Sequence, residues 1–324
     1  MNAPQFRRRR VTIYMLMLLT AIILTVIHDF LGPYWSYIVM YGLTVGIIGL
    51  GFNLLLGYNG LLSFGHAGLF GIGMYTVGLS IRYFNIDSLE LLILLAIVVG
   101  FLIASILGYI ASRLILVYFA LFMLAFGQII FTLVYKLYNI TLGSDGLPIT
   151  VTKIFNISFS SRAEFLYYYY YFVIIVFILC TLFMWILVNS HFGKTIQAIK
   201  FDDIRVTYIG IPVHKYRYIA FLISALYATI AGAIYAPLAG HITPDNVSFV
   251  FSGEIVYLTL LGGMNSFSGP IVGAFVYTLI KVYLSTITEY WQFVMGATLI
   301  VIVLLFPNGI MGLVGLASSK FRKR

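Results

Sequence analysis

The sequence predicts an all-α integral membrane protein, a polytopic bundle of about ten transmembrane helices, with about eight as the lower bound. Of its 324 residues, 62% are hydrophobic and 9% are charged, and the mean hydropathy is +1.04. A water-soluble domain with this composition would expose large apolar patches. A helix formed by one of its apolar runs would be about long enough to cross the hydrocarbon core of a membrane. Helices are favoured there because backbone groups in lipid must form their hydrogen bonds within the protein. We therefore expect one helical membrane domain over residues 1–324.

Ten apolar runs are candidate spans. Their approximate limits are 11–31, 35–57, 66–84, 89–112, 114–138, 166–189, 217–239, 250–263, 270–288 and 291–306. If two of them re-enter the membrane instead of crossing it, the number of spans falls to about eight and both chain ends stay on the same side.

The basic residues indicate which side is cytoplasmic. Most of the 19 Lys and Arg residues fall in three clusters: Arg7 to Arg10; Lys194, Lys200, Arg205, Lys215 and Arg217; and Lys320 and Arg322 to Arg324. By the positive-inside rule these clusters predict that both termini and the loop at 190–217 are cytoplasmic. The basic residues that give the chain its net charge of +9 do not form a basic domain with interleaved aromatic residues. Membrane lipid rather than nucleic acid is therefore the expected partner.

No catalytic site, metal site or cofactor is expected. The single cysteine, Cys180, lies in an apolar run, and no nucleophile, base and acid stand in a catalytic arrangement. Gly193, Lys194 and Thr195 resemble the end of a phosphate-binding loop, but that motif needs glycine where this chain has Val188. The longest hydrophilic segments, 139–165 and 190–216, are too short for separate domains, so any ATP hydrolysis must come from partner chains.

Two glycine-rich polar runs interrupt the apolar pattern, at 57–68 (GYNGLLSFGHAG) and at 261–270 (LGGMNSFSGP). Non-helical backbone near hydrocarbon is tolerated only where protein buries it or a water-filled cavity borders it. The runs are candidates either for a transport pathway with its gate or for tight turns on the cytoplasmic side. Their shared Leu-Gly and Ser-Phe pairs hint at a duplicated half in parallel orientation. The candidate pathway residues here are Asn53, Gly57, Asn59, Ser63, Gly65, His66, Gly262, Gly263 and Ser266.

Ionisable residues inside two apolar runs are further candidates. Glu254 and Lys281 are costly at membrane depth and are expected to face a cavity or each other. His66 could bind a substrate carboxylate, although a histidine in a glycine turn more often bonds backbone. The tyrosines at 167–171 are typical of an aromatic belt at the membrane surface, with a ligand cage as the alternative.

Small residues predict close helix packing in the seventh run. Ser224, Ala228, Gly232, Ala236 and Gly240 recur every four residues and leave a groove for a neighbouring backbone. Two shorter contacts of this kind are predicted at Gly42 with Gly46 and at Gly269 with Gly273. Pro237 is expected to kink or end its helix.

Eight blocks of sequence resemble, in order, the permeases of branched-chain amino acid ABC importers, especially the M-type subunit of the leucine, isoleucine and valine system. The blocks are 53–68, Tyr118 to Ala120 with Leu124 to Gln128, 143–148, 193–212, 231–236, 260–264, 269–270 and 307–310. The resemblance covers most of the chain. It implies a pore subunit of the ABC importer permease type, without enzymatic activity of its own.

The resemblance also implies partners: a second, related permease subunit, two cytoplasmic ABC ATPases and an extracytoplasmic solute-binding protein. Residues 193–212 would then be the coupling segment, a short helix that docks on an ATPase. Its expected contacts are an apolar anchor with a polar rim, and its expected ends are two glycines. These coupling residues are Ile199, Ile204 and Ile209 for the anchor, Asp202, Asp203 and Arg205 for the rim, and Gly193 and Gly210.

Three transport functions remain open at this level. The first is ATP-driven import of leucine, isoleucine, valine or related amino acids by alternating access. The second is the same machine for urea or short amides, because urea permeases share these blocks. The third is an ion-coupled secondary amino acid transporter, in which an acid such as Glu254 would carry the coupling ion.

Overall fold

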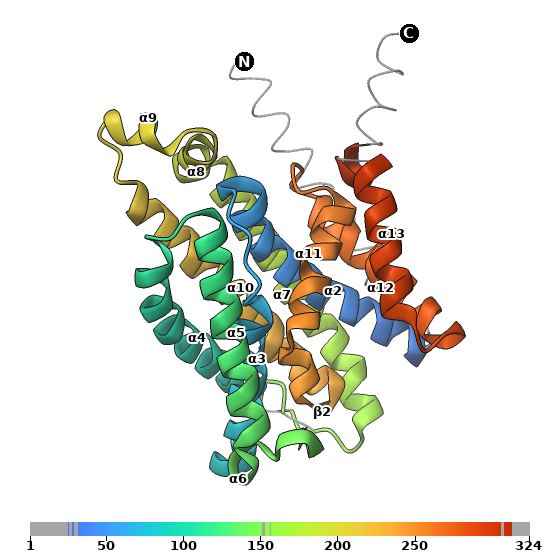
Figure 1. Ribbon diagram of the computed structural model, residues 1–324. Helices are drawn as coiled ribbons and strands as arrows, with labels where there is room; N and C mark the ends of the chain where they lie inside the picture. The colour runs from blue at the N-terminus through green and yellow to red at the C-terminus, as the bar shows by residue number, and fades with distance from the viewer. Residues whose placement is uncertain are drawn as a thin grey trace.

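The protein is a helical bundle, seen in a computed structural model that describes residues 32–150, 153–155, 157–305 and 308–312 together with Thr25 and His28 (Figure 1). In chain order its elements are α2 (Pro33–Asn53), η1 (Leu54–Asn59), α3 (His66–Phe84), α4 (Leu89–Ala111), α5 (Leu116–Lys136), α6 (Tyr138–Thr141), η2 (Gly143–Asp145), β1 (Leu147–Pro148), α7 (Arg162–Asn189), α8 (His191–Phe201), α9 (Asp203–Tyr208), α10 (Val213–Ala239), β2 (His241–Ile242), η3 (Pro244–Val247), α11 (Phe249–Gly262), α12 (Gly269–Ile287) and α13 (Trp291–Leu305). Strands β1 and β2 pair antiparallel over two residues each, so the predicted all-α class is confirmed.

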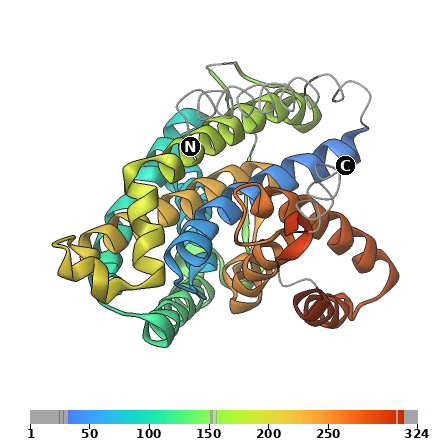
Figure 2. The same cartoon turned by 90° about the horizontal axis from the view of Figure 1, so that it is seen from above.

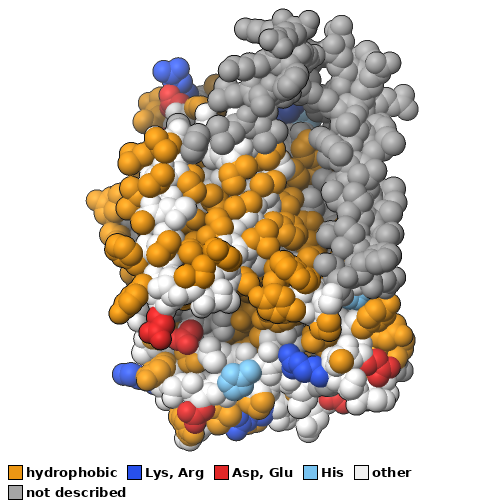
Figure 3. Space-filling view, turned by 90° about the vertical axis from the view of Figure 1, so that its right-hand side faces the viewer, with side chains coloured by type: hydrophobic (Ala, Val, Ile, Leu, Met, Phe, Trp, Pro, Cys, Tyr) orange, Lys and Arg blue, Asp and Glu red, His pale blue; other side chains and the backbone are white. Residues whose placement is uncertain are grey.

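Six helices among the described residues are long and apolar enough to cross a membrane. They are α2 with η1, α4, α5, α7, α10 and α12, and α11 and α13 are shorter apolar helices. The predicted run at 11–31 lies outside the described residues except for Thr25 and His28, as do the basic clusters near both termini. On one face, apolar side chains form a band with charged and histidine side chains beyond it (Figure 3). These features confirm a polytopic helical membrane protein.

The bundle has two distinct ends. The α8–α9 end holds α8 and α9, and the β1–β2 end holds α6, β1 and β2 (Figure 1). Helix α2 runs from the β1–β2 end to the α8–α9 end, where η1 packs on α8. Viewed from above, α2 and α10 run side by side through the middle of the bundle, and α12 and α13 lie to one side of it (Figure 2).

The first glycine-rich run is a break inside the bundle. After the π-helical turn η1, the backbone at 60–65 is not helical, and it leads from the α8–α9 end back into the interior, where α3 begins at His66. Helix α3 then continues to the β1–β2 end, where Gly78 contacts Ile242. The crossing between α2 and α4 therefore consists of a non-helical half and a helical half, surrounded by protein, as the polar sequence requires.

A second break has the opposite orientation. Helix α10 descends to the β1–β2 end, residues 240–248 return to the interior through β2 and η3, and α11 begins at Phe249. Val247 lies against Gly71 of α3, while the far end of α11, at Gly263, contacts Asn308 near the α8–α9 end. Thus α3 and α11 begin near each other and run in opposite directions. The two glycine-rich runs keep the parallel orientation that the sequence predicted, because α2 and α11 both end at the α8–α9 end and α3 and α12 both lead away from it. The duplication itself stays a prediction.

Glycines allow the half-helices to pack closely on their neighbours. A Cβ on Gly232 would collide with the carbonyl of Phe70 in α3, and one on Gly73 would collide with the carbonyl of Thr229 in α10. Gly273 in α12 approaches the carbonyl of Leu258 in α11 in the same way. The predicted close approach of backbones is therefore confirmed at Gly232 and at Gly273. Gly42 and Gly46 instead make room for the side chains of Phe275 and Phe177.

Helix α10 ends just after Pro237, as predicted, whereas the tyrosine run is more buried than a surface belt. Pro237 lies in the last turn of α10, which ends at Ala239, and Gly240 follows with a φ of 69°. Tyr169 and Tyr170 are buried, and Tyr169 donates a hydrogen bond to the carbonyl of Ile234 at 2.6 Å. Only part of the tyrosine run is exposed, so the run serves the core as well as the membrane surface.

Replacing Gly232 with valine should destabilise the bundle by at least about 2 kcal/mol, because α3 and α10 must separate to admit the side chain. The matched control is Gly296→Val in α13, where an added Cβ meets nothing within 4 Å. Thermal unfolding of both variants in detergent, followed by loss of monodisperse protein, measures the difference. Equal stability of the two variants would contradict the close contact between α3 and α10.

Candidate functional site

A chain of hydrogen bonds through His66 holds the first break in place. The Ser224 hydroxyl lies 2.6 Å from the carbonyl of Gly51 and 2.8 Å from His66 Nε2, and His66 Nδ1 lies 2.8 Å from the Ser63 hydroxyl. Since Ser224 donates its only proton to Gly51, Nε2–H must donate to Ser224, and Ser63 must donate to Nδ1. The imidazole is thus a neutral bridge between the start of α3, α10 and α2.

Serine hydroxyls accept hydrogen bonds from backbone amides at the starts of α3 and α11. The amide of Ala67 donates to the Ser252 hydroxyl at 3.1 Å, and Ser248 caps α11 by accepting from the amide of Phe251. Ser63, Gly65 and His66 are buried. These contacts replace the hydrogen bonds that water would give to a helix N-terminus. The region is therefore a closed joint in this conformation, and His66 bonds two serine hydroxyls rather than backbone.

The two glycine-rich runs meet at the α8–α9 end. Asn53 Nδ2 donates to the carbonyl of Ser266 at 3.4 Å, and a Cβ on Gly57 would collide with the carbonyl of Met264. At the second run Gly263 has a φ of 109°, which favours glycine, and it closes the turn between α11 and α12. The second run is thus a tight turn, as one of the two sequence interpretations predicted, while the first is a re-entrant break.

Several polar atoms at this meeting point lack protein partners. Both amide atoms of Asn59 and Oδ1 of Asn53 are buried without a hydrogen bond to the described residues. Gly262 lies where α11 and α12 touch, with no room for a side chain. An unsatisfied buried amide costs about 1–3 kcal/mol, so another arrangement of these segments could be of similar free energy.

Helix α8 contacts the break directly. Lys200 Nζ donates to the carbonyl of Gly57 at 2.8 Å, and its methylene groups lie against Gly60. The carbonyl of Gly57 is in the π-helical turn, where regular helical pairing is disturbed. Any displacement of α8 is therefore passed to the break through a charge-assisted hydrogen bond.

The segment after α8 forms a second short helix, α9, rather than part of one helix. Asp202 begins it by accepting from the amide of Arg205 at 3.0 Å, and its carboxylate lies 2.7 Å from the Arg205 guanidinium. Gly210, with a φ of 86°, follows the helix end, as predicted. Gly193 in α8 has no room for a Cβ because the carbonyl of Val188 is adjacent. The two glycines therefore shape the loop.

The exposed face of this loop is apolar and aromatic. Phe201 is 87% exposed and Tyr208 is 85% exposed, and Ile204 and Ile209 are also exposed. Ile199 is 2% exposed and packs with Val206 and Val213, so its expected role in an exposed anchor is wrong. Residues packed inside the loop cannot contact a partner, and the anchor available on this surface is made by Phe201, Ile204, Tyr208 and Ile209.

The charged residues of the loop are partly used within the chain. Asp203 accepts a hydrogen bond from the Arg217 guanidinium at 2.9 Å, and the Arg217 side chain is buried. This ion pair ties α9 to the start of α10. Asp202 and Arg205 remain at the surface, so of the three expected rim residues Asp203 has a structural partner of its own.

A second polar site lies within the membrane region, between α11, α12 and α13. Lys281 Nζ is 2.8 Å from Glu254 Oε2, and Tyr277 donates a hydrogen bond to the same oxygen. The ammonium group also lies 5.0 Å from the ring centroid of Trp291. The sequence-based expectation that Glu254 and Lys281 face each other is therefore met by the structure.

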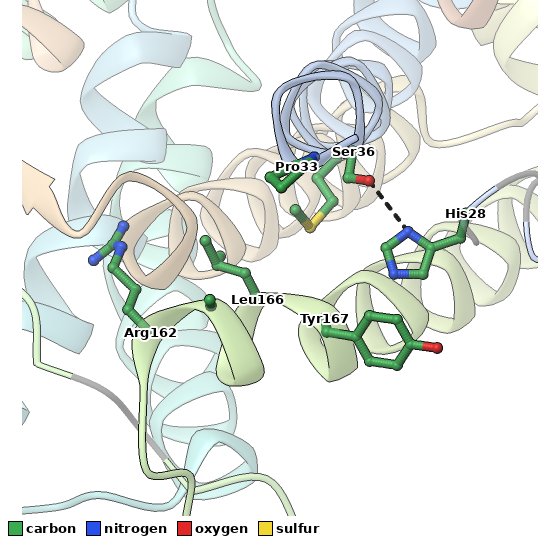
Figure 4. A pocket seen from close by; sticks show the side chains of 8 residues that line it. His28, Pro33, Ser36, Arg162, Leu166 and Tyr167 are labelled. Atoms are coloured by element: carbon green, nitrogen blue, oxygen red, sulfur yellow. Dashed lines mark hydrogen bonds between the residues drawn. The ribbon is translucent and has the colours of Figure 1, made fainter. Parts of the chain in front are cut away.

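Cavities border the described helices at several places. One, about 450 Å³, lies between α2 and α7 and is lined by Pro33, Ser36, Arg162 and Leu166, with His28 hydrogen-bonded to Ser36 at 3.2 Å (Figure 4). The Arg162 guanidinium donates to the carbonyl of Leu238. Another, about 170 Å³, adjoins Glu254.

These features define a class: a polytopic membrane transport protein with broken helices and a helical loop at one end, rather than a soluble or receptor-like fold. Residues 34–303 match the model of the family described as branched-chain amino acid transport system / permease component. The chain belongs to this family, as its resemblance predicted.

Relatives of two kinds are similar to the chain. It is 27% identical over 288 residues to the high-affinity branched-chain amino acid transport system permease protein LivM of Escherichia coli (strain K12), covering 82% of this chain and 67% of the relative. It is 27% identical over 292 residues to LivH of the same strain, covering 84% and 92%, and 24% identical over 291 residues to BraD of Pseudomonas aeruginosa, covering 84% and 94%. No solved structure matches the chain significantly.

Several residues of these sites escaped the sequence analysis. Phe201 and Tyr208 are aromatic residues in an otherwise hydrophilic loop, and that composition was the available signal. Ser224 was predicted only as a small residue for helix packing, and Ser252 was given no role. Hydroxyls at membrane depth need hydrogen-bond partners, and this was the available signal. Lys200 gave no local signal, because its contact with Gly57 spans 143 positions of sequence.

Replacing Ser224 with alanine should lower stability by about 2 kcal/mol, because His66 Nε2–H would be buried without an acceptor. Ser105→Ala is the matched control, since that exposed hydroxyl bonds only the carbonyl of Phe101 in its own helix. Chemical unfolding of the purified variants in mixed micelles compares the two. Equal free energies of unfolding would show that the bridge does not stabilise the break.

Proposed function

We propose that this chain is a permease subunit of an ATP-driven importer that carries leucine, isoleucine, valine or related amino acids into a bacterial cytoplasm by alternating access. Family membership supports the class, and the similarity to the branched-chain amino acid permeases LivM, LivH and BraD supports the cargo. The α8–α9 end is the cytoplasmic end in this proposal, because it carries Lys194, Lys200, Arg205, Lys215 and Arg217.

The observation that carries the proposal is the contact between the α8–α9 loop and the first break. An exposed aromatic surface at Phe201 and Tyr208 lies on the same loop as Lys200, which bonds the carbonyl of Gly57. A partner that moves the loop as a rigid body would therefore move the start of the broken crossing. We propose two cytoplasmic ABC ATPases as these partners, with hydrolysis confined to them, and with a second permease subunit and an extracytoplasmic solute-binding protein completing the importer.

The gate in this proposal is the region where the two glycine-rich runs meet. Asn53 bonds the carbonyl of Ser266, and Gly57 lies against the carbonyl of Met264. Asn59 lies in the same π-helical turn as Gly57, and Gly263 precedes Met264. Asn59 and Asn53 hold unsatisfied amide atoms in the closed arrangement, which favours a second arrangement in which they gain partners. Ser63, Gly65 and His66 would form the fixed joint about which this region moves.

Ion-coupled transport is the weaker alternative. A coupling acid must bind and release its ion, whereas Glu254 is already neutralised by Lys281 and bonded by Tyr277. Breaking such a buried pair costs several kcal/mol. Urea or short-amide import by the same machine differs only in cargo, and the transport assay below distinguishes it.

Cells or proteoliposomes that contain the whole importer should accumulate labelled leucine when ATP is supplied. Accumulation should stop when ATP is depleted and should persist with an uncoupler, because hydrolysis and not an ion gradient drives it. Labelled urea measured in parallel is the control for cargo. Uptake that collapses with the uncoupler would contradict the proposal, and uptake of urea alone would replace the cargo.

Replacing Phe201 and Tyr208 together with alanine should release the ATPases from the purified importer, with at least a tenfold loss of bound ATPase. Buried aromatic anchors contribute at least about 2 kcal/mol each at interfaces. Phe84→Ala, an exposed aromatic at the β1–β2 end, is the matched control. Co-purification of stoichiometric ATPase with the double variant would refute the docking surface.

A further inference from the structure

The cavity beside Glu254, between α11, α12 and α13, combines charge with an apolar lining. Glu254, Tyr257 and Tyr277 line it on one side, and Trp291, Met295 and Leu299 line it on the other. Its volume of about 170 Å³ is similar to that of engineered protein cavities, about 150 Å³, that admit benzene. A small molecule with an aliphatic part and a polar end matches this lining.

The Glu254 carboxylate has capacity for a further donor. Its side chain is 13% exposed, and the contacts from Lys281 and Tyr277 both reach Oε2. An ionised carboxylate accepts about four hydrogen bonds through its two oxygens. The Lys281 side chain is 25% exposed. Its ammonium group has three protons, of which one serves Glu254, and the aromatic rings of Tyr41, Tyr277 and Trp291 lie around it.

Tyr257 supplies an independent observation. Its ring is 4% exposed, and its hydroxyl is buried without a hydrogen-bond partner among the described residues. Buried tyrosine hydroxyls normally have partners. This hydroxyl belongs to a residue that lines the cavity beside Glu254, so a bound molecule would satisfy it.

The backbone leaves room for the apolar part of such a molecule. Gly253 in α11 and Gly296 in α13 both line the cavity, and an added Cβ at either position meets no atom within 4 Å. Val250, Met295 and Leu299 complete an apolar wall around this space. Gly253 is partly buried and Gly296 is exposed, so the cavity extends from the interior at Gly253 to the molecular surface at Gly296.

We propose that this cavity binds a free α-amino acid with an aliphatic side chain, whose ammonium group bonds Glu254 and whose carboxylate accepts a hydrogen bond from the Tyr257 hydroxyl. The aliphatic side chain occupies the space at Gly253 and Gly296. A zwitterion fits because its two opposite charges lie side by side, as those of Glu254 and Lys281 do, and it adds no net charge to the membrane interior. The choice of amino acid rests on the proposed import function, whereas the site rests on the contacts above.

The test is binding of labelled L-leucine to the purified importer in lipid nanodiscs. Tyr257→Phe should weaken binding about tenfold, because one hydrogen bond to a charged group is lost. It should not lower the thermal unfolding midpoint, since the hydroxyl is unpaired without ligand. Gly253→Val should weaken binding more than tenfold by filling the space, and Gly296→Val does the same should the first variant fail to fold. The matched control Gly32→Val, at a glycine with open space outside the cavity, should bind as the unaltered protein does.

Competition identifies the chemistry that is recognised. Leucinol, which lacks the carboxylate, and 4-methylpentanoate, which lacks the ammonium group, should each compete at least tenfold less well than leucine. Urea should not compete. Unchanged leucine binding in both Tyr257→Phe and Gly253→Val would overturn the site, and so would a lower unfolding midpoint in Tyr257→Phe with binding intact.

Transport measured on the same preparations separates the site from the proposed function. If the unaltered importer accumulates leucine with ATP and the cavity variants do so with unchanged KM, the site is wrong while the function stands. If the unaltered importer accumulates no leucine, the function is wrong, and direct binding still decides the site. A raised KM in Tyr257→Phe at unchanged maximal rate supports both.

Discussion

The structure depends on one constraint: backbone groups at a break in a membrane helix need protein partners, because hydrocarbon offers none. Residues 60–65 break one crossing and residues 240–248 break another. Both are enclosed by long helices, and the exposed amides at the starts of α3 and α11 are taken up by serine hydroxyls. The His66 bridge links the first break to α2 and α10. The breaks exist only because the rest of the bundle encloses them.

This enclosure explains the central place of α10. A helix that packs on two broken crossings must come close to both backbones, and large side chains would keep them apart. Gly232 brings α10 onto α3, while Ser224 gives the hydroxyl that joins His66 to Gly51. The small residues of α10 therefore have two functions, close approach and hydrogen bonding, which a pattern of residue size shows only in part.

The sequence predicted what local chemistry determines. Helix limits agree within a few residues where long apolar runs set them, and the polar runs marked the break and the turn. Ile199 was assigned to the wrong face since its burial depends on Val206 and Val213, which come together only when α8 and α9 fold back on α10. The Glu254–Lys281 pair was predictable because charges in apolar runs have few possible partners.

The two polar regions of the membrane interior are built differently, and the difference indicates different functions. At His66 each polar atom of the bridge has a protein partner, as expected for a fixed joint. At Glu254 the charges are paired, but a cavity, an unpartnered Tyr257 hydroxyl and two open glycines lie beside them. An unsatisfied polar group and an empty space each lower the stability of the folded protein. A permease that only needed to fold would close such a cavity, so its presence between α11, α12 and α13 favours a function in binding.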